Sequence, residues 1–210
     1  MNIAVIELGV SRRGSIGIST IATNLVVELA RRGEEPVLVD FERSFGTSVQ
    51  FIKKRDEHTR DVGIFATPSI STMKRSMSGS RSHVFDAGRF DSEMTSQLLP
   101  LVDVVLVPVG NKKSEKEALL SLAAQTKSQD VKMILVPSKI FAGDDEEDAM
   151  SYFSGFLNLG FSVSGVIHKR EEFVKALRLG CSVSELKYNE CGHQIIDLLD
   201  VCEYRLRGTK

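Results

Sequence analysis

The sequence predicts a single α/β domain in three layers, a mostly parallel, twisted sheet with helices on both faces. Strand-like and helix-like segments alternate along the chain, and the strand-like segments are continuous runs of valine, isoleucine and leucine. Such runs indicate strands that are covered on both faces, as in parallel sheets. The chain has 210 residues and 42% hydrophobic content, enough for one well-buried domain. No repeat or linker divides residues 1–210, so we expect one domain.

The expected strands and helices follow one another from one end of the chain to the other. Apolar runs predict the strands, and apolar residues at helical spacing predict the helices. The expected strands cover residues 3–8, 37–41, 62–66, 83–86, 104–109, 133–136 and 163–167. The expected helices cover residues 21–30, 92–99, 114–126, 146–159, 171–178 and 191–205, and a further helix ends at 53–55. The serine-rich segment 69–82 is expected to be a solvated loop.

Charge and composition exclude several classes of protein. The formal net charge of −1 argues against a wholly basic surface, so a nucleic-acid contact would need a local patch. No apolar run approaches the roughly 20 residues of a membrane helix, and the first residues lack a signal-peptide pattern. Three cysteines without metal-ligand spacing favour reduced thiols over a zinc site that includes His193. We therefore expect a cytoplasmic protein.

A glycine-containing turn joins the first expected strand to the first expected helix. Its sequence is Arg13-Gly14-Ser15-Ile16-Gly17-Ile18-Ser19-Thr20. At such a turn, backbone N–H groups and the positive end of the helix dipole converge, and nucleotide-binding proteins hold phosphate groups there. Phosphate-binding loops usually end in Gly-Lys-Ser/Thr, whereas this turn has Gly-Ile-Ser. The backbone cradle and the hydroxyl are retained, but the lysine charge is lost.

Two aspartates, Asp40 and Asp86, end expected core strands. In parallel sheets, ligands lie beyond the carboxyl ends of the strands, so two acids there predict a site for magnesium and water. A single strand-end aspartate is often only a helix cap or a turn residue. The combination of both acids with a phosphate loop, in this order, favours the site.

These residues resemble the motifs of the ParA/MinD family of deviant P-loop ATPases, which position plasmids, chromosomes and cell-division machinery. Family members carry Lys-Gly-Gly-Val-Gly-Lys-Thr-Thr where this chain has residues 13–20. Further similarities lie at residues 37–44, at 85–88 in the place of a Walker B motif, at 102–109 and at 169–185. The resemblance spans nearly the whole chain. The length of the chain resembles that of small ParA proteins without an N-terminal DNA-binding domain. It implies a P-loop NTPase-like fold.

The resemblance also implies a site for ATP or ADP with magnesium. Its cofactor-binding residues would be Arg13, Gly14, Ser15, Ile16, Gly17, Ile18, Ser19, Thr20 and Pro137. Ser19 and Asp86 would hold the magnesium ion, the latter through water, and Asp40 would orient the attacking water. Ile18 stands where the family has the lysine that contacts the β- and γ-phosphates, and Arg13 keeps a charge where the family's lysine crosses a nucleotide-sandwich dimer. We therefore expect weakened nucleotide binding and impaired hydrolysis.

The partners that the resemblance implies are a second copy of the chain, a centromere-binding or adaptor protein, and DNA bound without sequence specificity on the nucleoid. A basic patch for DNA would consist of Lys169, Arg170, Lys175, Arg178 and Lys187. The alternative is that these are ordinary surface residues near helix ends.

Three hypotheses for function follow. The first is a ParA-like partition or positioning protein that binds nucleotide weakly, and the second is a nucleotide-independent pseudo-ATPase scaffold or regulator that acts through protein–protein contacts. The third is an active ATPase that uses Arg12 or Arg13 in place of the missing lysine. Retention of Ser19 and both aspartates favours the first and third hypotheses, and Ile18 favours the second. If the cradle is intact, Ile18→Lys should raise the affinity for ATP.

Overall fold

The computed structural model describes the backbone of residues 1–8, 17–41, 46–67, 69–77, 81–89, 97–110, 115–127, 129, 131–140, 146–187 and 190–208. The strands are β1 (Asn2–Glu7), β2 (Val37–Asp40), β3 (Gly63–Ala66), β4 (His83–Arg89), β5 (Val104–Val109), β6 (Lys132–Ile140), β7 (Phe161–Val163) and β8 (Ile167–His168). The α-helices are α1 (Ile18–Arg31), α2 (Thr47–Asp56), α3 (Ile70–Ser76), α5 (Glu115–Thr126), α6 (Glu146–Ser154), α7 (Glu171–Leu179) and α8 (Glu190–Arg207). The single α/β domain that these elements form confirms the predicted fold class.

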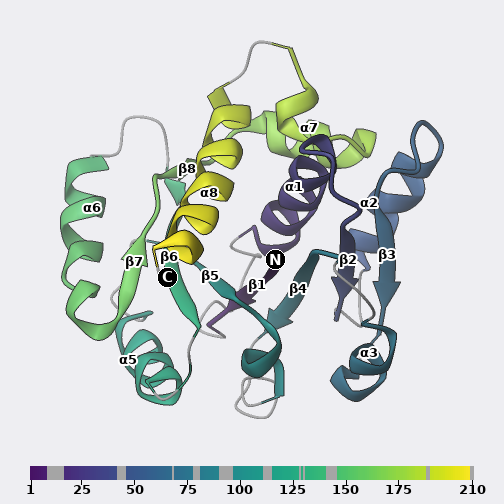
Figure 1. Ribbon diagram of the computed structural model, residues 1–210. Helices are drawn as coiled ribbons and strands as arrows, with labels where there is room; N and C mark the ends of the chain where they lie inside the picture. The colour runs from purple at the N-terminus through teal and green to yellow at the C-terminus, as the bar shows by residue number, and fades with distance from the viewer. Residues whose placement is uncertain are drawn as a thin grey trace.

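The sheet has the strand order β3-β2-β4-β1-β5-β6-β7, and the short strand β8 pairs with the far end of β6 (Figure 1). Every strand pairing among the described residues is parallel. The first strand of the chain lies in the middle of the sheet, so its carboxyl end lies at the centre of one sheet edge. In open α/β sheets, ligands bind at this edge.

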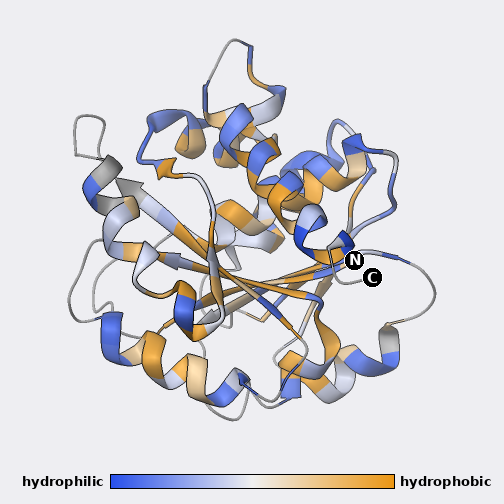
Figure 2. Cartoon of the chain, turned by 60° about the vertical axis from the view of Figure 1, so that its left-hand side comes forward, coloured by the Kyte–Doolittle hydropathy of each residue, from blue (hydrophilic) through white to orange (hydrophobic). Residues whose placement is uncertain are grey.

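Side chains of each central strand alternate between two hydrophobic cores. Ile3 and Val5 belong to the core under α1, α2, α7 and α8, whereas Ala4 and Ile6 belong to the core under α3, α5 and α6. All four are completely buried. Figure 2 shows the strands between the two layers of helices, with apolar residues along the strands. The continuous apolar runs of the sequence are explained by this burial on both faces.

Three expectations for single elements are wrong. Segment 69–82 is not all loop, since α3 begins after Ser69, whose Oγ accepts a hydrogen bond from Thr72 N at 3.3 Å. The expected strand 163–167 is interrupted between β7 and β8, where Ser164 Oγ donates to Gly165 O at 2.9 Å. The expected helix 146–159 ends at Ser154 and is followed by a short 3-10 helix. Most of the expected helix 92–99 lies outside the described residues.

A turn that follows α7 is fastened to α1 by buried hydrogen bonds. Asn24 Oδ1 accepts from Ser182 Oγ at 2.8 Å and from Val183 N at 2.7 Å, while Asn24 Nδ2 donates to Thr20 O at 2.7 Å. Ser184 Oγ donates to Glu28 Oε2 at 2.9 Å. The last third of the chain is thereby held against the helix that begins at the predicted phosphate loop. Within the described part of the chain, no helix is long and apolar enough to cross a membrane.

We expect His83 to make the stability of the fold depend on pH. Its side chain is 6% exposed, its Nδ1 lies 3.1 Å from Asn2 Oδ1, and burial lowers the pKa of its imidazole. Because the unfolded chain then takes up a proton at a higher pH than the folded chain, stability is lost as the pH falls below the unfolded pKa of about 6.5. Urea unfolding at pH 7.5 and 5.5 should give a smaller free energy of unfolding at pH 5.5.

The variant His83→Gln should remove part of this pH dependence. The matched variant His58→Gln, at an exposed position, should keep the wild-type profile. Equal profiles for wild type and His83→Gln would show that the dependence comes from other groups.

Candidate functional site

The N-cap residue of α1 is Gly17, which has the left-handed conformation, with φ 95° and ψ 22°. Ile21 N donates the first hydrogen bond of the helix to Gly17 O at 2.8 Å. A side chain at this φ would be strained, so the glycine is required by the backbone. The first turn of α1 contains no acidic residue, and the N–H groups of a first turn have no acceptor within the helix. This end of α1 is therefore suited to an anion.

Ile18, the first residue of α1, points into the protein. It is 3% exposed and belongs to the hydrophobic core between the sheet and helices α1, α2, α7 and α8. Fully burying an isoleucine stabilises a fold by about 1.5–3 kcal/mol. Position 18 thus contributes to the stability of the core and offers no donor group to a phosphate.

The carbonyl groups of the first turn of α1 are held by side chains one turn later. Thr23 Oγ1 donates to Ser19 O at 2.7 Å, and Asn24 Nδ2 donates to Thr20 O. Thr23 and Asn24 are buried. These bonds fix the backbone on which the Ser19 and Thr20 hydroxyls are carried.

The two predicted acids lie side by side in the sheet. Asp40 in β2 and Asp86 in β4 are register partners, and each is 1% exposed. The strand β4 continues to Arg89, beyond a register shift against β1 between Val5 and Glu7, so the expectation that Asp86 ends its strand is wrong. Carboxylates at neighbouring positions suit a divalent cation, which would offset their mutual repulsion.

The predicted magnesium ligands match the ion in the type of atom that they offer. Asp86 already accepts a hydrogen bond from Ser48 Oγ, in α2, at 2.7 Å. The described residues contain no group of three or more His, Cys, Asp or Glu side chains that could hold a metal ion. Two carboxylates and the Ser19 hydroxyl are oxygen donors of the kind that magnesium prefers, and the ion would supply positive charge to phosphate groups. The role of Ser19 and Asp86 as metal ligands stays a prediction, as does the role of Asp40.

Ser48→Ala tests what the buried hydrogen bond to Asp86 contributes. Removing a donor from a buried carboxylate should lower the free energy of unfolding by about 1–3 kcal/mol. The matched variant is Ser154→Ala, which removes an exposed bond of the same length, 2.7 Å, to Ser151 O. Its cost should be close to zero, because water replaces the lost partner. Urea unfolding of both variants measures the difference, and equal costs would show that Asp86 does not depend on Ser48.

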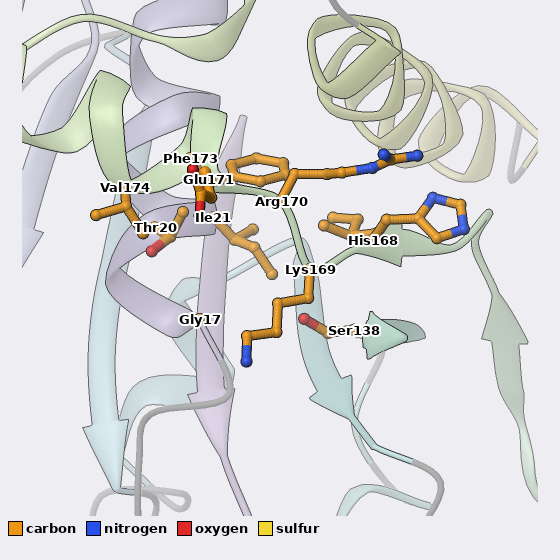
Figure 3. A pocket seen from close by; sticks show the side chains of 11 residues that line it. Gly17, Thr20, Ile21, Ser138, His168, Lys169, Arg170, Glu171, Phe173 and Val174 are labelled. Atoms are coloured by element: carbon orange, nitrogen blue, oxygen red, sulfur yellow. The ribbon is translucent and has the colours of Figure 1, made fainter. Parts of the chain in front are cut away.

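A pocket of about 450 Å³ opens beside the start of α1. It is lined by three segments that lie far apart in the sequence: the first turn of α1, the end of β6, and β8 with the start of α7 (Figure 3). Its lining residues are Gly17, Thr20, Ile21, Ser138, Ile167, His168, Lys169, Arg170, Glu171, Phe173 and Val174. A volume of this size and a mixture of apolar and polar groups are typical of small-ligand sites.

Apolar side chains gather at one end of the pocket, beside Thr20 and Glu171, and the Lys169 side chain reaches the other end (Figure 3). Ile21, Phe173 and Val174 supply the apolar wall, while Gly17, Ser138 and the Lys169 side chain lie together at the opposite end (Figure 3). A Cβ atom on Gly17 would lie 3.8 Å from Ser138 Oγ, which shows how closely α1 and β6 approach. The arrangement can hold a flat ring against the apolar wall and an anionic group near the helix end.

The structure brings some of the predicted cofactor residues together and separates others. Gly17 and Thr20 line the pocket, whereas Ile18 lies in the core and Pro137 is buried in β6 opposite Val109. Ser19 is half-buried in the first turn of α1. The remaining members of the predicted set, residues 13–16, lie outside the described residues, and so do residues 42–44.

The predicted DNA patch divides into two parts. Lys175 and Arg178, one turn apart on α7, and Lys187 are exposed. Arg170 Nη2 lies 3.4 Å from Glu190 Oε2 at the start of α8, and Lys169 points into the pocket instead of outward (Figure 3). The patch as a DNA-binding surface stays a prediction.

The sequence analysis did not identify Phe173 as a site residue, nor did it predict that the β8–α7 segment lines a pocket. The sequence places Phe173 on the buried face of an amphipathic helix, which is where its ring lies. No local pattern shows that this helix starts beside residues 17–21. Ser138, which follows the predicted residue Pro137, is 4% exposed and is a neighbour of Gly17.

Comparisons with known proteins support the fold. Neither a protein-family profile nor a curated protein matches the sequence. Solved structures are similar over almost the whole chain. A chain of the MinC:MinD cell-division complex of Aquifex aeolicus has a TM-score of 0.71 at 15% identity, covering 100% of this chain and 97% of that one. A putative plasmid partition protein from Borrelia burgdorferi bound to AMPPNP has 0.71 at 12%, covering 97% and 98%.

A complex of Cyanothece McdA with ATP has a TM-score of 0.67 at 14% identity, covering 100% of this chain and 97% of that one. At these identities the similarity shows the fold, and the functions of those proteins are not thereby transferred. Over its full length, the chain has the fold of the ParA/MinD/McdA deviant Walker A ATPases.

Proposed function

We propose that this protein is a ParA-like positioning or partition protein that binds an adenine nucleotide weakly and hydrolyses it poorly or not at all. The observation that carries the proposal is the pocket of about 450 Å³ between the start of α1, the end of β6 and the β8–α7 segment. Solved structures with this fold are described as complexes with ATP and with AMPPNP. Impaired hydrolysis is expected because Ile18 supplies no charge to the transferred phosphoryl group.

Different residues would contact the base, the phosphates and the magnesium ion. Phe173 and Ile21 would pack against the base, and the N–H groups at the start of α1 would receive the phosphates, with the Thr20 hydroxyl beside them. Asp40 and Asp86 would hold magnesium and its water ligands. Binding, rather than turnover, would then change the state of the protein, as a switch between two conformations or between monomer and dimer.

Calorimetric titration with a slowly hydrolysed ATP analogue and magnesium, and separately with ADP, tests the proposal. Binding in the micromolar range is the expected result. Val174→Glu, which places a negative charge on the exposed rim of the pocket, should weaken binding by roughly ten-fold. Leu179→Glu, at an equally exposed position of α7 that does not line the pocket, is the matched control and should have little effect. No heat at millimolar nucleotide with folded protein would reject the proposal.

The second candidate function is a pseudo-ATPase scaffold that acts through protein–protein contacts without nucleotide. Two observations favour it: Ile18 is part of the core, and Asp86 is engaged by Ser48. The same titration separates the candidates, because a scaffold of this kind would give no heat while retaining its thermal unfolding transition. The MinC:MinD complex is a case in which a protein of this fold binds a protein partner.

We also propose that the exposed basic residues of α7 contact DNA without sequence specificity. Lys175 and Arg178 lie one turn apart on the exposed side of the helix. The double variant Lys175→Glu/Arg178→Glu should abolish retention on DNA at low salt, and wild-type retention should fall steeply as salt is raised. Lys116→Glu, on the exposed face of α5, is a charge-reversal control that should retain DNA. Unchanged retention of the double variant would reject the patch.

A further inference from the structure

The segment between β8 and α7 directs successive side chains to opposite sides. His168 faces α8, where its backbone N donates to Gln194 Oε1 at 3.2 Å and its Nδ1 lies 2.6 Å from Gln194 Nε2. Side chains alternate along an extended chain, so Lys169 is directed away from Gln194. Residues 167–170 all contribute to the lining of the pocket, and β8 is fixed by its pairing of Ile167 with Ser138 in β6. The backbone that carries Lys169 is thus anchored on both sides.

Lys169 reaches across the pocket toward the start of α1. Figure 3 shows its side chain passing Ser138 and ending near Gly17, while the Arg170 side chain runs in another direction, toward Glu190 at the start of α8. The carboxylate of the lining, Glu171, lies with Phe173 at the α7 end of the pocket (Figure 3). The positive charge is therefore directed to the end of the pocket where the helix dipole is also positive.

Lys169 carries the positive charge that Ile18 lacks. Ile18 is buried in the core, and the first turn of α1 has no acidic residue that would neutralise an added cation. A lysine ammonium has three donors and acts as a point charge toward phosphate. Its long side chain is anchored here to a different element, about 150 residues further along the chain than the turn that it faces.

We propose that Lys169 supplies the cation that holds the phosphate groups of a nucleotide in this pocket, in place of a lysine in the first turn of α1. The nucleotide would lie with its base against Phe173 and its phosphates between Gly17, Ser138 and Lys169. This assignment rests on the proposed nucleotide-binding function, and it removes Lys169 from the outward-facing DNA patch.

Binding of ADP to Lys169→Gln tests the assignment. The variant should bind ADP at least ten-fold more weakly than the wild type, because one charge-assisted contact to phosphate is lost. Lys169→Arg should retain most of the affinity, and Lys175→Gln, at an exposed lysine of α7 outside the pocket lining, should bind like the wild type. Because Lys169 is exposed, all three variants should unfold at the wild-type temperature.

The salt dependence distinguishes a phosphate contact from a structural effect. The difference between wild type and Lys169→Gln should shrink as sodium chloride is raised from about 50 mM to 500 mM, since salt screens a charge contact and leaves packing unchanged. Equal ADP affinity of wild type and Lys169→Gln would overturn the assignment and leave the proposed function standing. Absence of ADP binding by the folded wild type at millimolar concentration would overturn both.

Discussion

Gly180→Ala is expected to lower the free energy of unfolding by about 2–5 kcal/mol. Gly180 ends α7 with φ 68°, a conformation that costs a residue with a Cβ about 1–2 kcal/mol. The added Cβ would also lie 2.6 Å from Arg55 N and 2.8 Å from the carbonyl carbon of Lys54. These are backbone atoms of α2, so the overlap is relieved only if the two helices move apart, which costs a further 1–3 kcal/mol or so.

The side chain of Arg55, in α2, also bonds to the end of α7. Its guanidinium, 4% exposed, donates to Gly180 O, to Asp61 and, through both terminal nitrogens, to Glu185 at 2.9 and 3.0 Å. Burial, the largest single influence, would lower the pKa of Arg55, but the hydrogen bonds to the two carboxylates together raise it. The hydrogen bond from Arg55 in turn lowers the pKa of Asp61. Moving α7 away from α2 would therefore strain the hydrogen bonds of the Arg55 guanidinium, and water could not replace all of its lost partners.

Gly33→Ala separates the conformational cost from the overlap. Gly33 has φ 86°, and nothing lies within 4 Å of a Cβ placed there. Its substitution should cost only the conformational part, about 1–2 kcal/mol. Urea unfolding followed by circular dichroism compares the two variants at the same pH. If both lose the same stability, α7 does not depend on its approach to α2, and the pocket that α7 helps to line is less rigidly held than its contacts indicate.

Much of the fold could be predicted because its signals are local. Runs such as residues 104–109 are completely buried on both faces, and this alone favours a parallel sheet with helices on each side. The errors fall where the local signal is short. Among the residues of α3 whose burial the structure describes, only Ile70 and Met73 mark its buried side within a serine-rich segment. A two-residue strand such as β8 cannot be separated by pattern from the apolar run before it.

The candidate site was harder to predict, because its side chains come from distant segments. Which of them meet depends on how the helices pack on the sheet, and no local sequence pattern encodes that packing. The sequence places Asp40 and Asp86 at the same edge of the sheet, and register pairing confirms that they are neighbours. It does not show that Ser48 in α2 would be bonded to Asp86, nor that Lys169 would face Gly17 across a pocket. Both contacts are set by how distant helices pack on the sheet.

Ile18→Lys is expected to lower the free energy of unfolding by about 2–4 kcal/mol. The substitution removes buried apolar surface worth about 1.5–3 kcal/mol and brings an ammonium group that cannot remain in the core. To reach water, the lysine must leave the position of the isoleucine and lie along the start of α1. Ile18→Met, which keeps an apolar side chain of similar volume, is the matched control and should cost less than about 1.5 kcal/mol. Thermal and urea unfolding measure both variants.

The same variant measures how the two cations share the phosphate site. A lysine at position 18 that reaches the pocket raises ADP affinity, as the sequence predicts, and does so more strongly when Lys169 is replaced by Gln. If each lysine can neutralise the same phosphate, the two substitutions are not additive, and the double variant Ile18→Lys/Lys169→Gln should recover most of the wild-type affinity. Additive effects would mean that the cations contact different groups. Loss of stability without any gain in affinity would mean that the core at position 18 is closed to the pocket.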